Sequence, residues 1–104
     1  MAQMRSRVEL DAILRAALGT TNVYYDPPES FKLKYPCIVY HDSGRIVWKA
    51  DNQTYIKYRR YMLNYITPNA DDPKVDVIEE LPFCKMATPY ASDGLFHYPY
   101  NIDF

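Results

Sequence analysis

The sequence predicts an α+β fold, a single small domain over residues 1–104 in which a mostly antiparallel sheet carries an N-terminal helix and a second short helix. Three observations predict this class. The 104 residues are enough for one compact domain. Apolar residues make up 48% of the chain and are spread along it, so a core can form. They recur at helical spacing near the start, whereas alternating patterns and short runs of β-forming residues dominate the rest.

Two helices are expected. Ser6 and Glu9 form a capping box, and apolar residues then recur at helical spacing until Gly19 ends the first helix. Asp72 is the expected N-cap of the second helix, and Pro73 takes its first helical position. The second helix is short, and its apolar face consists of Val75, Ile78 and Leu81.

The first β segments follow the first helix. Residues 22–30 (NVYYDPPES) are expected to form a short extended arm, stiffened by two consecutive prolines that fix φ. Residues 35–41 (YPCIVYH) form a nearly continuous apolar run, which predicts the central strand of the sheet, covered on both faces. Residues 42–53 begin with turn residues at positions 43 and 44 and are expected to project as a hairpin or long loop.

The C-terminal segments also predict strands. Residues 83–88 suit a strand and residues 92–94 a turn. Pro99 cannot donate a backbone hydrogen bond, so the last strand is expected at an edge of the sheet, or with position 99 facing away from a neighbour. The alternating pattern of this strand places five side chains on one face: Phe96, Tyr98, Tyr100, Ile102 and Phe104.

Residues 55–66 (YIKYRRYMLNYI) carry four of the chain's eleven tyrosines, at spacings that fit a helical stripe. A long strand is favoured, because the segment is rich in β-forming residues, ends at Thr67 and Pro68 and lies between predicted β segments. On a strand the first half is polar on both faces and the second half is apolar on both. Such a strand is buried in the sheet at its end and extends beyond the sheet at its beginning, where it is placed to meet another subunit.

The overall composition argues against several classes of partner. Twelve basic and thirteen acidic residues give a net charge of -1, so no overall field draws the chain to nucleic acid or to an anionic membrane. The charged N-terminal segment fits neither a signal peptide nor a membrane span. Two cysteines are too few for a disulfide scaffold, and we expect both to be buried thiols in a reducing compartment.

The residue patterns favour neither catalysis nor a metal site. Cys37 and His41 suggest a thiol nucleophile with its base, but four positions along a strand separate them by about 13 Å, where about 3 Å is needed. His97 stands alone and adds no metal-ligand cluster. Acidic residues at the start of the second helix complement the helix dipole and cap its amides: Asp71, Asp72 and Asp76. We therefore expect no enzyme and no bound metal or cofactor.

The basic residues among the tyrosines of the 55–66 segment leave a nucleic-acid alternative open. Lys57, Arg59 and Arg60 lie among tyrosines, and proteins that bind single-stranded nucleic acids use such a mixture of basic and aromatic side chains. On a strand, however, Arg59 and Arg60 point to opposite faces. An aromatic content of 15%, mostly tyrosine, is also typical of protein interfaces, because tyrosine buries area and keeps a polar tip. Contact with other proteins is the favoured interpretation.

The order of these segments resembles the small tail terminator, or tail completion, proteins of long-tailed (siphovirus-type) bacteriophages. The similarity spans nearly the whole chain. Its most specific part is residues 23–30 (VYYDPPES) followed by residues 34–40 (KYPCIVY), which are structural signatures and not catalytic motifs.

The resemblance implies an α+β subunit that assembles with copies of itself as a ring, typically hexameric, on the last ring of the finished tail tube. Such a ring stops tube polymerisation and joins the tail to the head connector or stopper protein, and the genome passes through it. It also implies assembly in the host cytoplasm, a place in the tail or neck of the virion, and no membrane, cofactor or specific nucleic-acid partner. The alternatives are a head completion or stopper protein, a small nucleic-acid-binding module and a small hydrolase.

Seven residues are candidates for subunit or partner contacts: Asp26, Glu29, Trp48, Tyr55, Tyr58, Arg59 and Arg60. Those of the 55–66 strand are candidates for ring contacts, with the acidic residues of the proline arm as their partners. The 42–53 segment is the candidate for docking on the tube or connector, because tryptophan is prominent in interface hot spots. The alternative for Trp48 is a core position under the loop.

Overall fold

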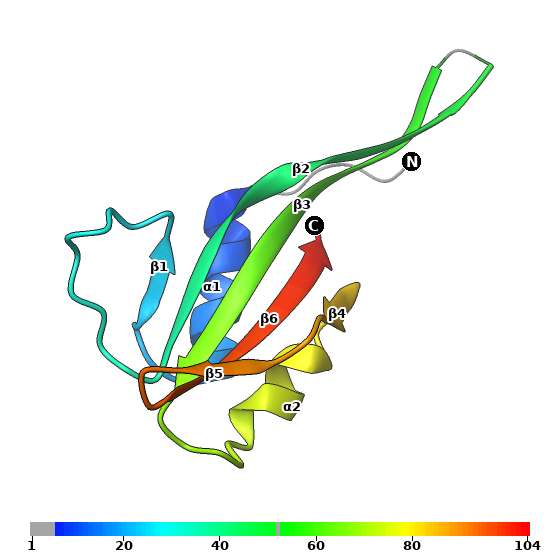
Figure 1. Cartoon of the computed structure of the whole chain (residues 1–104). Coiled ribbons are helices and arrows are strands. Elements are labelled where there is room, and N and C mark those ends of the chain that lie inside the picture. Colours follow the sequence, from blue (N-terminus) through cyan, green and yellow to red (C-terminus); the bar gives the residue numbers. More distant parts are fainter. Residues whose placement is uncertain (1–5, 52) are drawn as a thin grey trace.

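A computed structural model describes residues 6–51 and 53–104 and confirms the α+β class (Figure 1). The described elements, in chain order, are α1 (Arg7–Leu18), β1 (Val23–Tyr25), β2 (Cys37–Ala50), β3 (Gln53–Thr67), α2 (Lys74–Glu79), β4 (Cys84–Met86), β5 (Tyr90–Ser92) and β6 (Leu95–Asp103). The strands form one sheet in the order β1-β2-β3-β6-β4, and β5 also pairs with β6. Only the pairing of β1 with β2 is parallel among these described strands, so the sheet is mostly antiparallel, as predicted.

Helix α1 begins and ends where the sequence predicts. The Ser6 hydroxyl accepts a hydrogen bond from the backbone N–H of Glu9 at 3.2 Å, which satisfies one of the free amides at the helix start. Gly19 follows the last helical residue with φ of 79°, a left-handed conformation that glycine adopts without steric cost. The apolar stripe of α1 is fully buried and consists of Leu10, Leu14 and Leu18.

The core lies between the helices and one face of the sheet, and Figure 1 shows α1 lying behind β2 and β3. Helix α2 adds Ile78 to this core, with Val75 and Leu81 packed against it, so its predicted apolar face is confirmed. Four strands supply the other side of the core: Val23 from β1; Ile38 and Tyr40 from β2; Tyr61, Leu63 and Tyr65 from β3; Tyr100 and Ile102 from β6, followed by Phe104.

The 55–66 segment is the long strand that was favoured over a helix, and it is the centre of the sheet. The prediction that residues 35–41 form the central strand is therefore wrong in position, because this run is part of β2 and lies beside β1. The prediction that this run is covered on both faces holds only at its start, at Cys37. On the face away from the helices Cys37 is buried, Val39 is half-buried and His41 is exposed.

The predicted projecting hairpin is confirmed, but its turn lies elsewhere than expected. The prediction of a turn at positions 43 and 44 is wrong, because β2 continues to Ala50 and the chain reverses near Asp51. The register between β2 and β3 shifts between Asp42 and Gly44, so Ser43 is the extra residue of a β-bulge. Gly44 has φ of 130°, which a residue with a side chain rarely adopts, and this explains why a glycine stands inside a strand.

The C-terminal turn and strand are confirmed, whereas the edge position is wrong. Strand β6 is flanked by β3 on one side and by β4 and β5 on the other. The carbonyl of Pro99 accepts a hydrogen bond from the N–H of Ala87 at 2.8 Å, one residue beyond the end of β4. The proline nitrogen faces this same side, away from β3, because N–H and C=O of one strand residue point the same way. The N–H that Pro99 lacks would therefore point to a place where β4 has already ended.

Buried tyrosines attach the sheet to both helices through their hydroxyl groups. Tyr40 donates to Asp11 of α1 at 2.6 Å, and Tyr100 donates to the carbonyl of Val75 in α2 at 2.9 Å. Each ring fills the core while its hydroxyl reaches a polar partner at the helix surface. These contacts fix how the helices lie on the sheet as well as how deeply they pack.

Asp72 is the acceptor of a third such contact, just before α2. It accepts hydrogen bonds from Tyr65 at 2.7 Å, from Thr67 at 2.8 Å and from the backbone N–H of Lys74 at 2.9 Å. Burial alone would raise the pKa of Asp72, but these hydrogen bonds outweigh it and hold the pKa below its usual value. Helix α2 begins at Lys74 with Pro73 at its N-cap position, so the predicted start at Pro73 with Asp72 as N-cap is wrong by one residue. Asp72 still binds the first amide of α2 and joins it to the end of β3.

We expect Asp72→Asn to lower the free energy of unfolding by about 2 kcal/mol at pH 7, because two buried hydroxyls lose a charged acceptor. A carboxylate with a lowered folded pKa stabilises the fold above its unfolded pKa of about 3.9, and this contribution disappears as the pH falls through the folded value. Denaturant unfolding from pH 7 to pH 3 should therefore show the difference between variant and parent shrinking on acidification. The exposed neighbour Asp71→Asn is the control and should unfold like the parent; equal losses in both variants would contradict this role for Asp72.

Candidate functional site: the projecting hairpin

The β2–β3 ladder extends well beyond the rest of the sheet. Strand β6 pairs with β3 from Thr67 only as far as Arg60, opposite Asp103. Beyond that point β2 and β3 continue as a pair from Gly44 to the turn, and we call residues 44–60 the distal hairpin. Figure 1 shows the distal hairpin projecting from the body, and the chain measures 51 × 26 × 23 Å along its principal axes. The prediction that this strand leaves the sheet at its beginning is confirmed.

A polar cluster at the bulge sets the direction of the distal hairpin. Asp42 accepts hydrogen bonds from the backbone N–H of Gly44 at 2.9 Å and from the Arg45 guanidinium at 3.1 Å. The amide of Gly44, followed by the charge of Arg45, holds the pKa of Asp42 below its usual value. The Nε of Arg59 lies 3.7 Å from the same carboxylate, which is an ion pair but too long for a hydrogen bond.

Both arginines that were predicted to make ring contacts have partners within their own chain. Arg60 forms two hydrogen bonds to the carboxylate of Asp103, at 2.8 and 3.1 Å, across the last pair of β3 and β6. Arg59 donates to the Tyr61 hydroxyl at 3.1 Å, while its buried Nε has no hydrogen-bond acceptor among residues 6–51 and 53–104. Arg60 is therefore bound at the base of the hairpin, and the Nε of Arg59 is buried near Asp42 without a hydrogen bond.

Trp48 lies on the distal hairpin with 65% of its surface exposed. The alternative of a core tryptophan under a loop is therefore wrong. Trp48 pairs with Ile56 and Ile46 pairs with Tyr58 in the register, so Ile46, Trp48 and Tyr58 share one face of the ribbon. The backbone of Tyr55 belongs to β3, but its side chain lies outside the described part of the structure, so its predicted contact stays a prediction.

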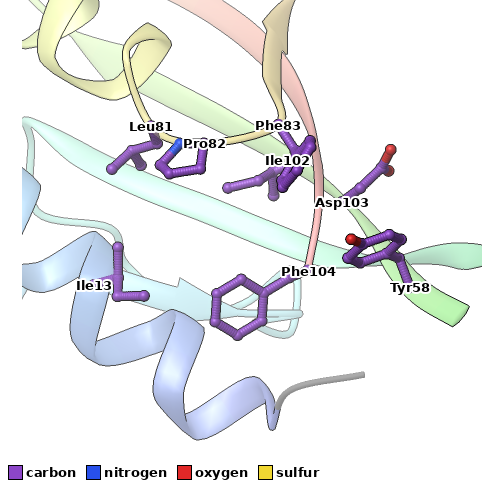
Figure 2. A pocket seen from close by; sticks show the side chains of 8 residues that line it. All are labelled: Ile13, Tyr58, Leu81, Pro82, Phe83, Ile102, Asp103 and Phe104. Atoms are coloured by element: carbon purple, nitrogen blue, oxygen red, sulfur yellow. The ribbon is translucent and has the colours of Figure 1, made fainter. Parts of the chain in front are cut away.

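An apolar pocket of about 110 Å³ lies at the base of the hairpin, where β6 ends, and Figure 2 shows the side chains around it. Tyr58 forms one wall, and its ring centroid lies 5.7 Å from that of Phe83. Phe83 is 68% exposed and has φ of 58°, so the backbone turns sharply between α2 and β4 and leaves this ring on the surface. The lining comes from four separate segments: Ile13, Tyr58, Leu81, Pro82, Phe83, Ile102, Asp103 and Phe104.

Sequence reasoning missed this pocket, apart from Tyr58. Its members are far apart in the chain, and only the antiparallel β3–β6 pairing brings Phe104 beside Arg59, where the two backbones exchange hydrogen bonds of 3.1 and 2.8 Å. One signal was available, namely the apolar run Leu81, Pro82 and Phe83 directly after an acidic helix end. An exposed aromatic residue there was assigned to a strand instead.

The acidic residues of the proline arm lie on the opposite side of the sheet from β6. Asp26 and Glu29 are both exposed, and the N–H of Asp26 donates to the carbonyl of Tyr40 at 2.9 Å, which fastens the arm to β2. Strand β1 is an edge strand of the described sheet, Arg60 lies beside β6 opposite Asp103, and the Arg59 side chain lies toward β2, 3.7 Å from Asp42. Contacts between this arm and the arginines of a neighbouring copy stay a prediction.

The thiols and imidazoles are dispersed. Cys37 is fully buried, and burial raises its thiol pKa to about 11, so the thiolate is rare at neutral pH. His41 is exposed on the same strand, and His97 stacks on Tyr90 with ring centroids 4.6 Å apart. No group of three or more histidine, cysteine or acidic side chains suited to hold a metal ion occurs within residues 6–51 and 53–104.

Neither helix of the described chain is long and apolar enough to cross a membrane. In comparisons with known proteins, no family model and no curated protein sequence matches the chain.

We expect Cys37 to react with a thiol reagent at pH 7.5 roughly 100-fold more slowly in the folded than in the unfolded chain, because it is buried and its pKa is raised. A Cys84→Ser background isolates the Cys37 signal in a spectrophotometric assay. His41→Ala in that background should leave the rate unchanged. A rate in the folded state that falls on removal of His41 would show that the imidazole activates the thiol and would revive the hydrolase alternative.

Proposed function

We propose that this protein is a structural subunit of the neck of a long-tailed bacteriophage. In this role it forms a homo-oligomeric ring, typically hexameric, on the end of the completed tail tube, stops tube polymerisation and joins the tail to the head connector. The single observation that supports this most directly is the distal hairpin, residues 44–60, which extends past the core with an exposed tryptophan. The segment order that resembles tail terminator proteins supports the same role.

A hairpin of this kind needs a partner for physical reasons. A two-stranded ribbon without a covering face is only marginally stable in water. Beyond Arg59, whose backbone still exchanges hydrogen bonds with Phe104, the described part of the distal hairpin consists of β2 and β3 alone. Its bulge and its ion pairs at Asp42 and Asp103 hold its base. A ribbon that is held at its base and carries exposed apolar side chains is suited to lie against another protein.

A ring also requires two different surfaces on each subunit, one of which receives what the other offers. The distal hairpin provides the first, with Trp48, Tyr58 and Arg59 as its proposed contact residues and Tyr55 near the turn. The exposed carboxylates of Asp26 and Glu29, on the far edge of the sheet, remain proposed acidic partners. Arg60 is assigned chiefly to bracing the hairpin, because its Nε and Nη2 already donate to both carboxylate oxygens of Asp103.

The proposal assigns no chemistry to the chain. Its partners are other copies of itself, the tail tube protein and the connector or stopper protein, and its place is the virion neck after assembly in the host cytoplasm. A net charge of -1 suits a ring through which the genome passes without being held. The buried, protonated Cys37 and the exposed His41 require no role in this function.

Electron microscopy of particles made with this gene deleted tests the function. We expect overlong, irregular tails detached from filled heads, because nothing stops the growth of the tube. The intact gene supplied in trans should restore tails of uniform length, and so should the double variant Cys37→Ala, His41→Ala. Tails of normal length beside leaking or tailless heads would contradict a terminator and place the protein on the connector side.

A further inference from the structure

We propose that the distal hairpin of one copy docks on the apolar pocket of a second copy, with Trp48 as the anchor that enters it. The inference rests on the proposed ring and names the contact that builds it. It commits to a second copy of this chain as the occupant of the pocket. Trp48 and the pocket lie on different parts of one chain, although Tyr58 at the base of the hairpin is also a pocket wall, so the contact is head-to-tail.

The pocket suits one ring of an aromatic side chain. Its volume of about 110 Å³ is comparable with that of apolar cavities of about 150 Å³ that bind benzene. Figure 2 shows Ile13 and Phe104 on one side of it and Leu81 and Pro82 on the other. Its walls are apolar apart from Asp103 and the Tyr58 hydroxyl, so an indole entering it would displace water from apolar surface on both partners.

The hairpin presents Trp48 where its own chain cannot cover it. The side chain is 65% exposed, and the register places it two positions nearer the turn than Ile46, which faces Tyr58 at the pocket wall. Figure 1 shows the ribbon leading away from the body, and the strand register places Trp48 near the turn of that ribbon. An exposed tryptophan and an open apolar pocket in the same chain are alike in polarity, and a second copy can bring them together.

Charge complementarity favours the same pairing. Residues 42–60 carry five basic and two acidic residues, a net charge of +3, whereas residues 71–80 carry five acidic residues and one basic residue, a net charge of -4. The acidic segment leads directly into the pocket wall, because Glu79 and Glu80 precede Leu81. Lys49, beside Trp48, and Glu80 are both exposed, and neither forms an ion pair within the described residues. A basic ribbon thus meets an acidic rim around an apolar centre.

The arrangement also explains why the contact propagates. A copy that inserts its hairpin into one neighbour still offers its own pocket to another neighbour, so the contact repeats until the ring closes. A symmetric pair that exchanged both hairpins would instead stop at two copies. The number of copies that can be linked covalently therefore distinguishes the two arrangements.

Cross-linking between single introduced cysteines tests the contact without removing the anchor. In the variant Lys49→Cys, Glu80→Cys, a short bis-maleimide linker should give a ladder of covalent multimers in denaturing gels, for concentrated free protein and for purified tails. The native thiols react slowly, because Cys37 and Cys84 have pKa values raised to about 11 by burial. The matched control Lys49→Cys, Asp93→Cys uses an exposed turn far from the pocket in the fold and should give no ladder.

The anchor is tested in the same background. We expect Trp48→Ala to lower the initial rate of cross-linking by about 30-fold at protein concentrations well below half-saturation, the loss typical of a central hot-spot residue. Val47→Ala removes an exposed apolar side chain from the other face of the same strand and should leave the rate unchanged.

Several outcomes would overturn the inference. A ladder that stops at dimers, an undiminished rate with Trp48→Ala, or no ladder in either preparation would each contradict the head-to-tail insertion. On tails, a Lys49→Cys chain linked to the tube or connector protein, as identified by mass spectrometry, would assign the hairpin to that partner. The free-protein ladder does not depend on a phage role, whereas the gene-deletion particles do not depend on Trp48, so the failure of one proposal is distinguishable from the failure of the other.

Discussion

One continuous ladder between β2 and β3 sets the rest of the structure. It runs for thirteen residue pairs, from Cys37 opposite Ile66 to Ala50 opposite Gln53. The half nearest Cys37 is flanked by β1 and β6 and lies over the helices, so it belongs to the core. In the other half, only Arg60 lies opposite a further strand of the described sheet, at Asp103 of β6. The same two strands therefore provide both the centre of the domain and its projecting ribbon, and the bulge at Ser43 marks the change between them.

Tyrosine is used differently in the two halves. In the sheet, Tyr40, Tyr65 and Tyr100 bury their rings and donate their hydroxyls to the helices or to Asp72. At the base of the ribbon, Tyr58 is half-buried and forms a pocket wall with Phe83. A residue with an apolar ring and a polar tip suits both positions, because each has a dry side and a polar side. The density of tyrosine in the 55–66 segment thus reflects a strand that passes from the core to an exposed surface.

Charge is separated along the molecule although the total is close to zero. The ribbon is basic, the segment around α2 is acidic, and the net charge of -1 conceals this division. Part of the ribbon's positive charge is neutralised within the chain, since Asp103 binds Arg60 and Asp42 is shared by Arg45 and Arg59. These exposed pairs each contribute about 0.2–1 kcal/mol to stability, so their larger effect is to hold the direction of the ribbon. The remaining charges are free to determine which surfaces of two copies attract each other.

The sequence by itself determined the fold class, the capped helix α1, the long strand β3 and the projection of the hairpin. Each of these depends on local patterns: the box of Ser6 and Glu9, Gly19 at the helix end, and the β-forming residues of the 55–66 segment. Sequence also singled out Trp48, because a lone tryptophan in a polar turn region is conspicuous. It did not decide between a buried and an exposed ring.

Only the tertiary structure decided that the Trp48 ring is exposed. It also decided the strand order, the partners of the arginines and the position of the pocket. Strand order depends on which segments pair across long separations, and β6 returns to lie beside β3 from the far end of the chain. Gly44 was expected in a turn but lies at a β-bulge. A glycine with positive φ is compatible with both structures, and the pairing of the flanking strands determines which one forms. The pocket is formed by residues that are far apart in the sequence: Ile13, Tyr58, Phe83 and Phe104. Their spacing along the chain does not predict that they lie together in the fold.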